Sequence, residues 1–566
     1  MARALLILLL SFPLGISAQI KNTGTPDIRN YPKSEYNAGT QNWAISQDEN
    51  GFIYFANNDG LLCFNGVEWD LTRVSTSSPL RSIMVDSGNT LYAGLINDFG
   101  IISREENRAS VFHSLKHLVP EDSREFDDIW RIYEVDGGIF FQCHNYIFHY
   151  KDEKIEVIRP KNRFHFAFKL DNRLIVQEPG IGLFEFRNGM MEALSWWKEN
   201  TGLEISTILE PDGNIKLIGT SHNGIYILEN GQLTEWNTPV SRYVKQNRLF
   251  CATILADNYY AFGTILNGLV ISDREGNIVH ILNTSAGIQN NTVLSLSMDK
   301  AKNLWLGLDN GIEYIETNSP LSYIGSNKIG TGYCCKVFKG NLYLGTNQGL
   351  FVTPLDSFSS SGDLKLVENT AGQVWTLEEF GGQLLCGHNK GTFIVNGTTA
   401  RNICDIEGAW KYIPLKDDPE LLIAGHYQGL VLLRKTDNQW KFYKKVKGFE
   451  ESSRYLFQDQ DGNIWVGHSG KGIFRLKIDM DEARVTELAR YNENNGLPSG
   501  LGNILLRHGE KLFVATDKGN FEYDNVTDAF VPSAGIKEIF GDAGKLKSLA
   551  PDNKGNIWFI ADSASG

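Results

Sequence analysis

The 566-residue sequence is poor in proline and cysteine, and it has no long hydrophobic run beyond its N-terminus. There are 16 prolines against 56 glycines, which excludes proline-rich linkers and favours many tight turns. The seven cysteines are odd in number and contain no CxxC pair, so they indicate neither a disulfide framework nor a zinc site. No later segment has the 18 or so consecutive apolar residues of a membrane helix.

Positive charge is also scarce. The chain has 54 Lys and Arg against 67 Asp and Glu, a net charge of −13. Binding to nucleic acid needs clustered Lys and Arg to contact phosphates, so we expect no nucleic-acid contact by this chain. Helical periodicity is hard to find, whereas the aromatic residues suit packing between β-sheets.

The first residues, MARALLILLLSFPLGISAQ, carry one basic residue, an apolar run and then small residues. This pattern predicts a secretory signal peptide over residues 1–18, with cleavage after Ala18. The mature chain is therefore expected outside the cytoplasm, in the periplasm.

The stretch DQDGNIWVG, Asp459 to Gly467, looks at first like an acidic site. It is not unique, because related stretches begin at Asp48, Pro211, Met298 and Pro551. The glycine of the turn that follows each stretch recurs from Gly60 to Gly519 about every 42 residues, the period of a propeller blade of four antiparallel strands. The motif is therefore interpreted as turn architecture, and we expect Asp461→Ala to cost about 1 kcal/mol of stability through a lost turn bond.

The repeats predict an all-β chain of thirteen blades. Their second strands are expected near Tyr54, Tyr92, Phe140, Ile175, Leu217, Phe262 and Trp305, then near Tyr343, Leu385, Ile423, Trp465, Phe513 and Trp558. One ring of thirteen would exceed the usual number of blades. We therefore predict two seven-bladed β-propellers in tandem, over residues 19–325 and 326–566, with the second incomplete at the C-terminus.

Propeller ligands usually lie over the central channel, where the segments that enter the innermost strands converge. Aromatic faces stack on sugar rings, and Arg donates to hydroxyls or carboxylates. We predict ligand contacts, or alternatively packing between blades, for Asn42, Trp43, Arg81, Trp130, Arg131, Trp375, Trp410, Lys411, Arg454 and Tyr455. The second propeller has the denser set, so we expect its site to matter more.

No catalytic or metal-binding residues are expected. No carboxylate pair stands apart from the repeated turns, as a glycosidase would need. His388, His426 and His468 occupy a slot where other repeats carry Thr, Leu or Asn, so they are interpreted as repeat variants rather than as metal ligands. No cofactor is expected.

The repeat DxxGNIWxG…GI resembles the two-component-regulator propeller repeat. The segment from Asn30 to Leu62, NYPKSEYNAGTQNWAISQDENGFIYFANNDGLL, resembles the start of the periplasmic sensor in Bacteroidetes-type regulators that carry a triple-tyrosine domain. The resemblance implies a double propeller followed by a triple-tyrosine domain, one membrane helix, and a LuxR-type or histidine-kinase output, none of which lies in this chain.

The expected function is sensing of a small molecule or oligosaccharide by the extracytoplasmic part of a regulator anchored in the inner membrane. Members of the resembled family with known inputs often sense glycan breakdown products. The alternatives are a periplasmic propeller enzyme of the glycosidase or lactonase type and a protein-binding scaffold. The sequence leaves a homodimer open.

Overall fold

The computed structural model describes residues 20, 24–74, 78–103, 110–187, 189–197, 202–212, 214–256, 259–319, 321–324, 329–355, 364–509, 511–541, 544–552 and 554–562. The predicted signal peptide, residues 1–18, and the predicted domain boundary at 325/326 lie outside the described residues. The chain divides into two compact units, one of Met1–Ser326 with Ser359–Ser361 and the other of Asn327–Phe358 with Gly362–Gly566.

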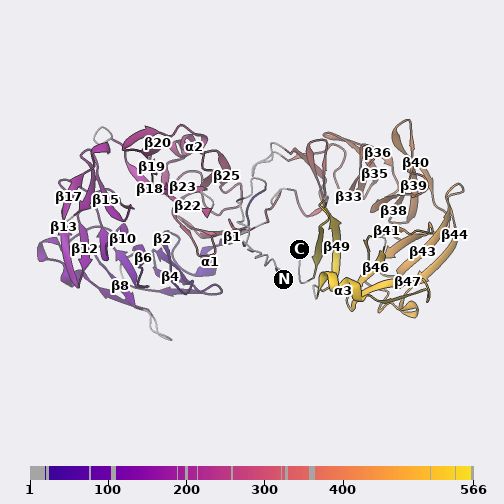
Figure 1. Cartoon of the computed structure of the whole chain (residues 1–566), viewed down its shortest axis with the longest axis horizontal. Helices are drawn as coiled ribbons and strands as arrows, with labels where there is room; N and C mark the ends of the chain where they lie inside the picture. The colour runs from indigo at the N-terminus through magenta and orange to yellow at the C-terminus, as the bar shows by residue number, and fades with distance from the viewer. Residues whose placement is uncertain are drawn as a thin grey trace, which may run out of the picture. The chain divides into compact units, whose positions relative to one another are not determined.

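The first unit contains seven four-stranded antiparallel sheets, arranged around one axis (Figure 1). Six of them consist of four strands in chain order. These are β2 (Asn42–Gln47), β3 (Ile53–Asn57), β4 (Gly60–Phe64) and β5 (Trp69–Thr72); β6 (Leu80–Val85), β7 (Leu91–Leu95), β8 (Phe99–Ser103) and β9 (Val111–Ser114); β10 (Arg131–Val135), β11 (Gly138–Gln142), β12 (Ile147–Lys151) and β13 (Lys154–Ile158); β14 (Ala167–Leu170), β15 (Arg173–Glu178), β16 (Gly182–Arg187) and β17 (Met190–Ala193); β18 (Ile205–Asp212), β19 (Ile215–Thr220), β20 (Gly224–Glu229) and β21 (Gln232–Glu235); and β22 (Leu249–Ile254), β23 (Tyr260–Thr264), β24 (Leu269–Ser272) and β25 (Ile278–Leu282).

The seventh sheet closes the first ring with the N-terminal strand. Three of its strands are β26 (Val293–Met298), β27 (Leu304–Leu308) and β28 (Ile312–Ile315), and the fourth is β1 (Ile28–Tyr31). β1 pairs antiparallel with β28, from Ile28 opposite Ile315 to Tyr31 opposite Ile312. The innermost strands β26 and β2 also lie side by side, so the first and last sheets of the unit meet.

The second unit contains five four-stranded sheets and one of two strands. They are formed by β29 (Gly332–Phe338), β30 (Asn341–Thr346), β31 (Leu350–Pro354) and β32 (Lys365–Leu366); β33 (Val374–Phe380), β34 (Gln383–His388), β35 (Gly391–Asn396) and β36 (Thr399–Cys404); β37 (Lys411–Pro414), β38 (Leu421–His426), β39 (Gly429–Thr436) and β40 (Gln439–Lys445); β41 (Tyr455–Gln458), β42 (Ile464–His468), β43 (Gly472–Asp479) and β44 (Arg484–Tyr491); β45 (Ile504–His508), β46 (Lys511–Thr516), β47 (Gly519–Asp524) and β48 (Ala529–Pro532); and β49 (Leu546–Pro551) with β50 (Ile557–Ala561).

Helix is confined to short pieces among the described residues. The α-helices are α1 (Lys33–Tyr36), α2 (Pro239–Asn247) and α3 (Ala534–Phe540). The 3-10 turns are η1 (Lys116–Leu118), η2 (Glu121–Ser123), η3 (Ser195–Trp197) and η6 (Glu493–Asn495). In the part of the chain that is described, no helix is both long and apolar enough to cross a membrane.

The all-β, two-propeller fold predicted from the repeats is confirmed. Each of the thirteen predicted second strands is the second strand of a sheet. In β3, β7, β11 and β27 every residue is buried, because neighbouring sheets cover both faces of an inner strand. This accounts for the continuous apolar runs that replace the alternation of a half-exposed strand.

A glycine near the end of many second strands lets adjacent blades approach closely. A Cβ atom added at Gly425 would lie 2.0 Å from the carbonyl oxygen of Ser453, at the start of the next blade. The equivalent atom at Gly387 would lie 2.4 Å from the carbonyl oxygen of Ala409. The small residue of the repeat is therefore required by packing between blades.

Candidate functional site

The repeated acidic turns bind their own backbone. At Asp459 the carboxylate accepts hydrogen bonds from the backbone N–H groups of Asp461 (3.0 Å) and Asn463 (2.8 Å) and from the indole N–H of Trp465 (2.8 Å). Asp299 holds Trp305 in the same way, at 3.1 Å. The hydrogen bonds that these carboxylates accept from described residues stay within the turn and the strand that follows it, as the architectural interpretation requires.

The prediction that Asp461 carries the turn was wrong. The Asp461 side chain is exposed, and among the described residues it makes no hydrogen bond or ion pair. The first carboxylate of the motif bonds back over the turn because its side chain reaches the N–H groups two and four residues later.

Half of the ten predicted ligand residues share one backbone position. In eight sheets the pairing between the first and second strands skips one residue at the start of the first strand, forming a β-bulge. The skipped residues are Trp43, Arg81, Ser206, Phe250, Leu294, Tyr333, Trp375 and Lys547. Trp130 and Trp410 are similarly placed, because each donates its backbone N–H at 2.8 Å to the residue that pairs with its neighbour. Bulges commonly redirect a side chain, and here they gather one side chain per blade at the end of the ring where the innermost strands begin, which we call the mouth.

The mouth of the second unit carries a continuous row of stacked side chains. Tyr333 stacks on Trp375 with ring centroids 5.0 Å apart, and Trp375 lies 4.4 Å from Trp410. The guanidinium of Arg454 lies over Trp410 at 5.0 Å and over Tyr455 at 5.5 Å. We call Tyr333, Trp375, Trp410, Arg454 and Tyr455 the mouth row. It joins four consecutive blades and unites four of the five residues predicted for this ring.

The remaining predicted residue of this ring, Lys411, lies beside the mouth row but is paired. Its ammonium group forms an ion pair with Glu378, which also accepts a hydrogen bond of 3.2 Å from Thr376. By contrast Arg454 is exposed and has no carboxylate partner among the described residues. The unpaired cation available at this mouth is therefore Arg454 rather than Lys411.

One further residue, Tyr427, completes the mouth of the second unit. Tyr427 accepts a hydrogen bond of 3.1 Å from the indole N–H of Trp375 and packs 5.2 Å from Trp410. Burial raises the pKa of Tyr427, against the opposing effect of that hydrogen bond. Tyr333 and Tyr427 were not among the residues predicted from the sequence. Tyr333 could have been found from its place before the apolar strand of its repeat.

The first unit has a smaller and more enclosed cluster at its mouth. Arg81 lies over Trp43 at 4.8 Å and over Trp130 at 5.6 Å. Its guanidinium also forms a salt bridge of 2.6 Å with Asp128 and a hydrogen bond of 3.2 Å to Asn58. The same Asn58 oxygen accepts the indole N–H of Trp43 at 2.9 Å. These polar groups are bound to one another, so the cluster offers fewer free groups than the mouth row.

Two predicted residues of the first ring do not suit ligand contact. Asn42 is fully buried; its amide donates to the carbonyl oxygen of Gly311 (3.0 Å) and accepts from Asn57 (2.8 Å). It holds the first and last blades together, so the ligand role predicted for it does not fit its burial. Arg131 lies 4.4 Å above the ring of Phe166 on the next blade, where it packs between blades.

The three repeat-variant histidines form hydrogen bonds with backbone groups of turns and loops. His388 and His468 accept backbone N–H groups of Lys390 (3.0 Å) and Gly470 (2.9 Å), as the hydroxyl of Thr516 does for Lys518 (3.1 Å). His426 instead bonds the carbonyl oxygen of Ile406 at 2.9 Å, and burial lowers its pKa to about 4. Within the described ranges no cluster of three or more His, Cys, Asp or Glu side chains suits a metal ion.

A solved structure has the same architecture as this chain over most of its length. The extracellular domain of BT3049 from B. thetaiotaomicron, described as a hybrid two component system, aligns with a TM-score of 0.62 at 16% identity, over 95% of this chain and 83% of that one. This chain has the fold of that extracellular domain. No family model and no curated protein matches the sequence.

Two other alignments have lower scores. The extracellular domain of BT4673 from the same organism aligns at 17% identity with a TM-score of 0.42, over 96% of this chain and 78% of that one. A streptogramin B lyase aligns at 16% identity with a TM-score of 0.41, over 52% of this chain and 98% of the lyase. Both are too weak to support an argument about function.

Proposed function

We propose that this chain is the extracytoplasmic sensing part of a membrane-anchored signalling protein and that it binds an oligosaccharide at the mouth of the second unit. The mouth row supports the proposal, because it presents stacked aromatic rings and an unpaired Arg454 on four consecutive blades. Sugar rings stack on aromatic faces, and a guanidinium donates to hydroxyl groups. The fold shared with the BT3049 extracellular domain, from a protein described as a two component system, supports the sensing role.

The two mouths differ in what they leave free for a ligand. In the first unit Arg81 is only 17% exposed and is neutralised by Asp128, so a ligand would have to displace that ion pair. In the second unit Tyr333 is 43% exposed and Arg454 is exposed. We therefore place the ligand at the second mouth, where binding costs no buried ion pair.

The proposal is tested by calorimetry of the purified chain with a panel of neutral tetrasaccharides. Arg454→Ala and Tyr333→Ala are the useful variants, because both side chains are exposed, whereas Trp410 is packed between three neighbours. Each is expected to weaken binding of the recognised sugar about ten-fold, or 1.4 kcal/mol. The matched control is Arg484→Ala, an exposed arginine on β44 of the same unit, which is expected to leave binding unchanged. Equal binding by all variants would remove the mouth row from consideration.

A further inference from the structure

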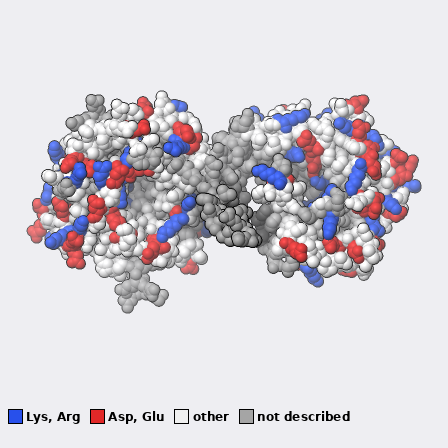
Figure 2. Space-filling model, viewed as in Figure 1, with Lys and Arg blue, Asp and Glu red and all other residues white. Residues whose placement is uncertain are grey.

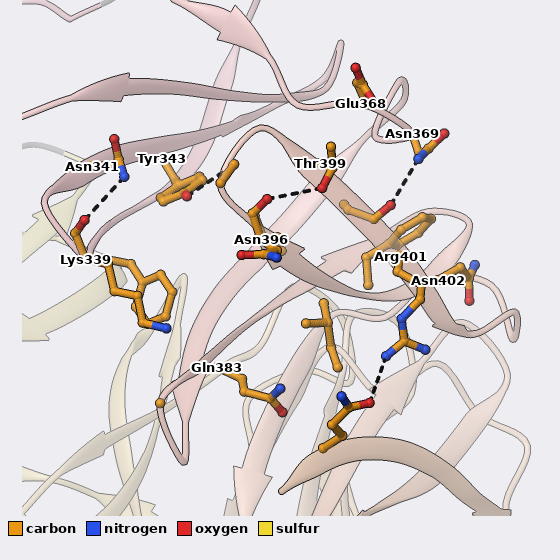
Figure 3. A pocket seen from close by; sticks show the side chains of 18 residues that line it. Lys339, Asn341, Tyr343, Glu368, Asn369, Gln383, Asn396, Thr399, Arg401 and Asn402 are labelled. Carbon is orange, nitrogen blue, oxygen red and sulfur yellow. Dashed lines mark hydrogen bonds between the residues drawn. The ribbon is translucent and has the colours of Figure 1, made fainter.

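The second unit also contains a large hollow, far from its mouth. It has a volume of about 1030 Å³ and is lined by residues of three consecutive sheets (Figure 3). Gln383 lines it just after β33 has ended at Phe380, whereas Trp375 of the mouth row stands at the beginning of β33. Gln383 pairs with Phe380, five residues beyond Trp375, so at 3.3 Å per residue the two positions are about 17 Å apart. The hollow is thus separate from the site proposed above.

Two cationic side chains face the hollow from different blades. Lys339 comes from the hairpin between β29 and β30, and Arg401 comes from β36. Arg401 has only a long hydrogen bond of 3.5 Å to Gln439, and Lys339 lies 4.9 Å above the ring of Phe338. Among the described residues neither has a carboxylate partner, in contrast to Lys411, Arg434 and Lys441 of the same unit. The sites of these two charges are therefore open to an anion.

The one acidic residue among the described residues that line the hollow does not neutralise these two charges. Glu368 lies at the edge of the group, and its carboxylate points away from Lys339 and Arg401 (Figure 3). The described lining residues thus carry two positive charges against one negative, in a chain whose net charge is −13. Figure 2 shows acidic and basic side chains interspersed over the visible face of both units. A local excess of positive charge in such a setting attracts anions selectively.

Amide groups occupy the space between the two cations. Asn396 and Gln383 lie between Lys339 and Arg401 in Figure 3. Among described residues the side chain of Asn396 has no hydrogen-bond partner, and Gln383 uses only its oxygen, which accepts from Trp440 at 3.1 Å. Free amides beside cations form a set that can donate and accept with sugar hydroxyls while the cations bind an acidic group.

We propose that this hollow is a second ligand site, which binds an anionic oligosaccharide through Lys339 and Arg401 and positions its hydroxyls with Asn396 and Gln383. The volume lies at the upper end of the range of about 300–1,000 Å³ for small-molecule sites, so it accommodates more than one sugar ring. Cations on opposite sides suit a ligand with acidic groups on separate rings. The hollow is thus a different site from the mouth row, and its ligand is an anionic rather than a neutral sugar.

The test is calorimetry of the purified chain with three tetrasaccharides: tetragalacturonate, its neutral methyl ester, and a sulfated chondroitin tetrasaccharide. At least one charged probe is expected to bind with Kd below about 1 mM, more than ten-fold tighter than the ester. Raising the salt concentration from about 0.05 to 0.5 M is expected to weaken binding of the charged tetrasaccharide, because salt screens exposed charges. The double variant Lys339→Gln/Arg401→Gln is expected to lose at least ten-fold in affinity, whereas Lys477→Gln, which removes one charge on β43 of the same unit, is not.

The outcomes separate the two proposed sites. The second site is overturned if neither charged probe binds, if the ester binds equally well, or if the double variant retains full affinity. If Arg454→Ala loses binding of the charged tetrasaccharide and the double variant does not, the charged sugar binds at the mouth. That result would overturn the second site alone. Loss only in the double variant supports the second site, whatever the neutral sugars do at the mouth row. Both substituted side chains are exposed, so the variants are expected to fold.

Discussion

Trp375 and Trp410 stack across neighbouring blades of the second unit, with ring centroids 4.4 Å apart and planes inclined by 36°. They lie 35 positions apart in the sequence, and each occupies the start of its blade's innermost strand. Their contact shows how a fold of repeated sheets collects one side chain per repeat at a common surface.

The arginines of the two mouths are expected to differ in their effect on stability. Arg81→Ala removes a cation that is 17% exposed and leaves Asp128, 22% exposed, without its partner. We expect a loss of about 2 kcal/mol in the free energy of unfolding. Arg454→Ala changes an exposed side chain and is expected to remain within about 0.5 kcal/mol of the parent. Urea denaturation followed by circular dichroism measures both; equal losses would contradict the difference between the mouths.

The two acidic residues of the DQDGNIWVG turn are expected to behave differently. Asp459→Ala removes the acceptor of several N–H groups, including the indole of Trp465, which is 1% exposed. The expected cost is about 2–3 kcal/mol, because a buried donor is left unpaired. Asp461→Ala, the matched control two residues away, is expected to cost less than about 0.5 kcal/mol. The prediction is contradicted if thermal melting shows the same shift for both.

Glu313 is expected to make the stability of the first ring depend on pH. It lies fully buried on β28, where burial raises its pKa to about 8, against lowering hydrogen bonds from Gln289. The unfolded chain has a Glu pKa of about 4.3. The folded state therefore binds the proton more tightly than the unfolded state. The stability that this provides is fully present below pH 4.3, and it is lost as the pH rises towards 8. The free energy of unfolding falls by up to about 1.4 kcal/mol per pH unit in this window.

Glu313→Gln removes this ionisation and keeps an acceptor for the Gln289 N–H group. The variant is expected to be more stable than the parent at pH 8 and to show a flatter profile between pH 5 and 8. Melting curves across this range measure the effect. A parent profile that rises with pH in this window, and is unchanged by the substitution, would show that Glu313 is already ionised in the fold.

The strand-end glycines are expected to tolerate no side chain. Gly425→Ala would place its Cβ atom 2.0 Å from a backbone oxygen of the next blade, so blades must separate at a cost of about 3 kcal/mol. Gly535→Ala is the control, because Gly535 lies in α3 with no atom within 4 Å of its added Cβ, and alanine favours a helix by about 1 kcal/mol. A melting temperature unchanged in Gly425→Ala would refute the packing role of this glycine.

Local repetition made much of the site predictable. The bulge position directly precedes the apolar inner strand in each repeat, so Trp43, Arg81, Trp375 and Trp410 could be identified as one class. Their partners could not, because Asp128 lies in a connection whose length and composition differ from blade to blade, and Tyr427 lies at a turn position where other blades carry Asn58 or Asn389. The pairing of Lys411 with Glu378 is of the same kind, since it depends on the spacing between adjacent inner strands. The repeat pattern does not predict the hollow beside Lys339 and Arg401.

The sequence by itself determined the architecture: thirteen repeats of about 42 residues, with buried inner strands, specify thirteen sheets in two rings, because the same turn and strand pattern folds in the same way each time. Only the tertiary structure decided how the first ring closes, with β1 beside β28 and Asn42 buried between the first and last blades. It also decided that Arg81 is neutralised by Asp128, whereas Arg454 has no carboxylate partner among the described residues. These are contacts between residues distant in the chain, and local pattern carries no information about which distant groups come within the 3 to 5 Å where ion pairs and stacked rings form.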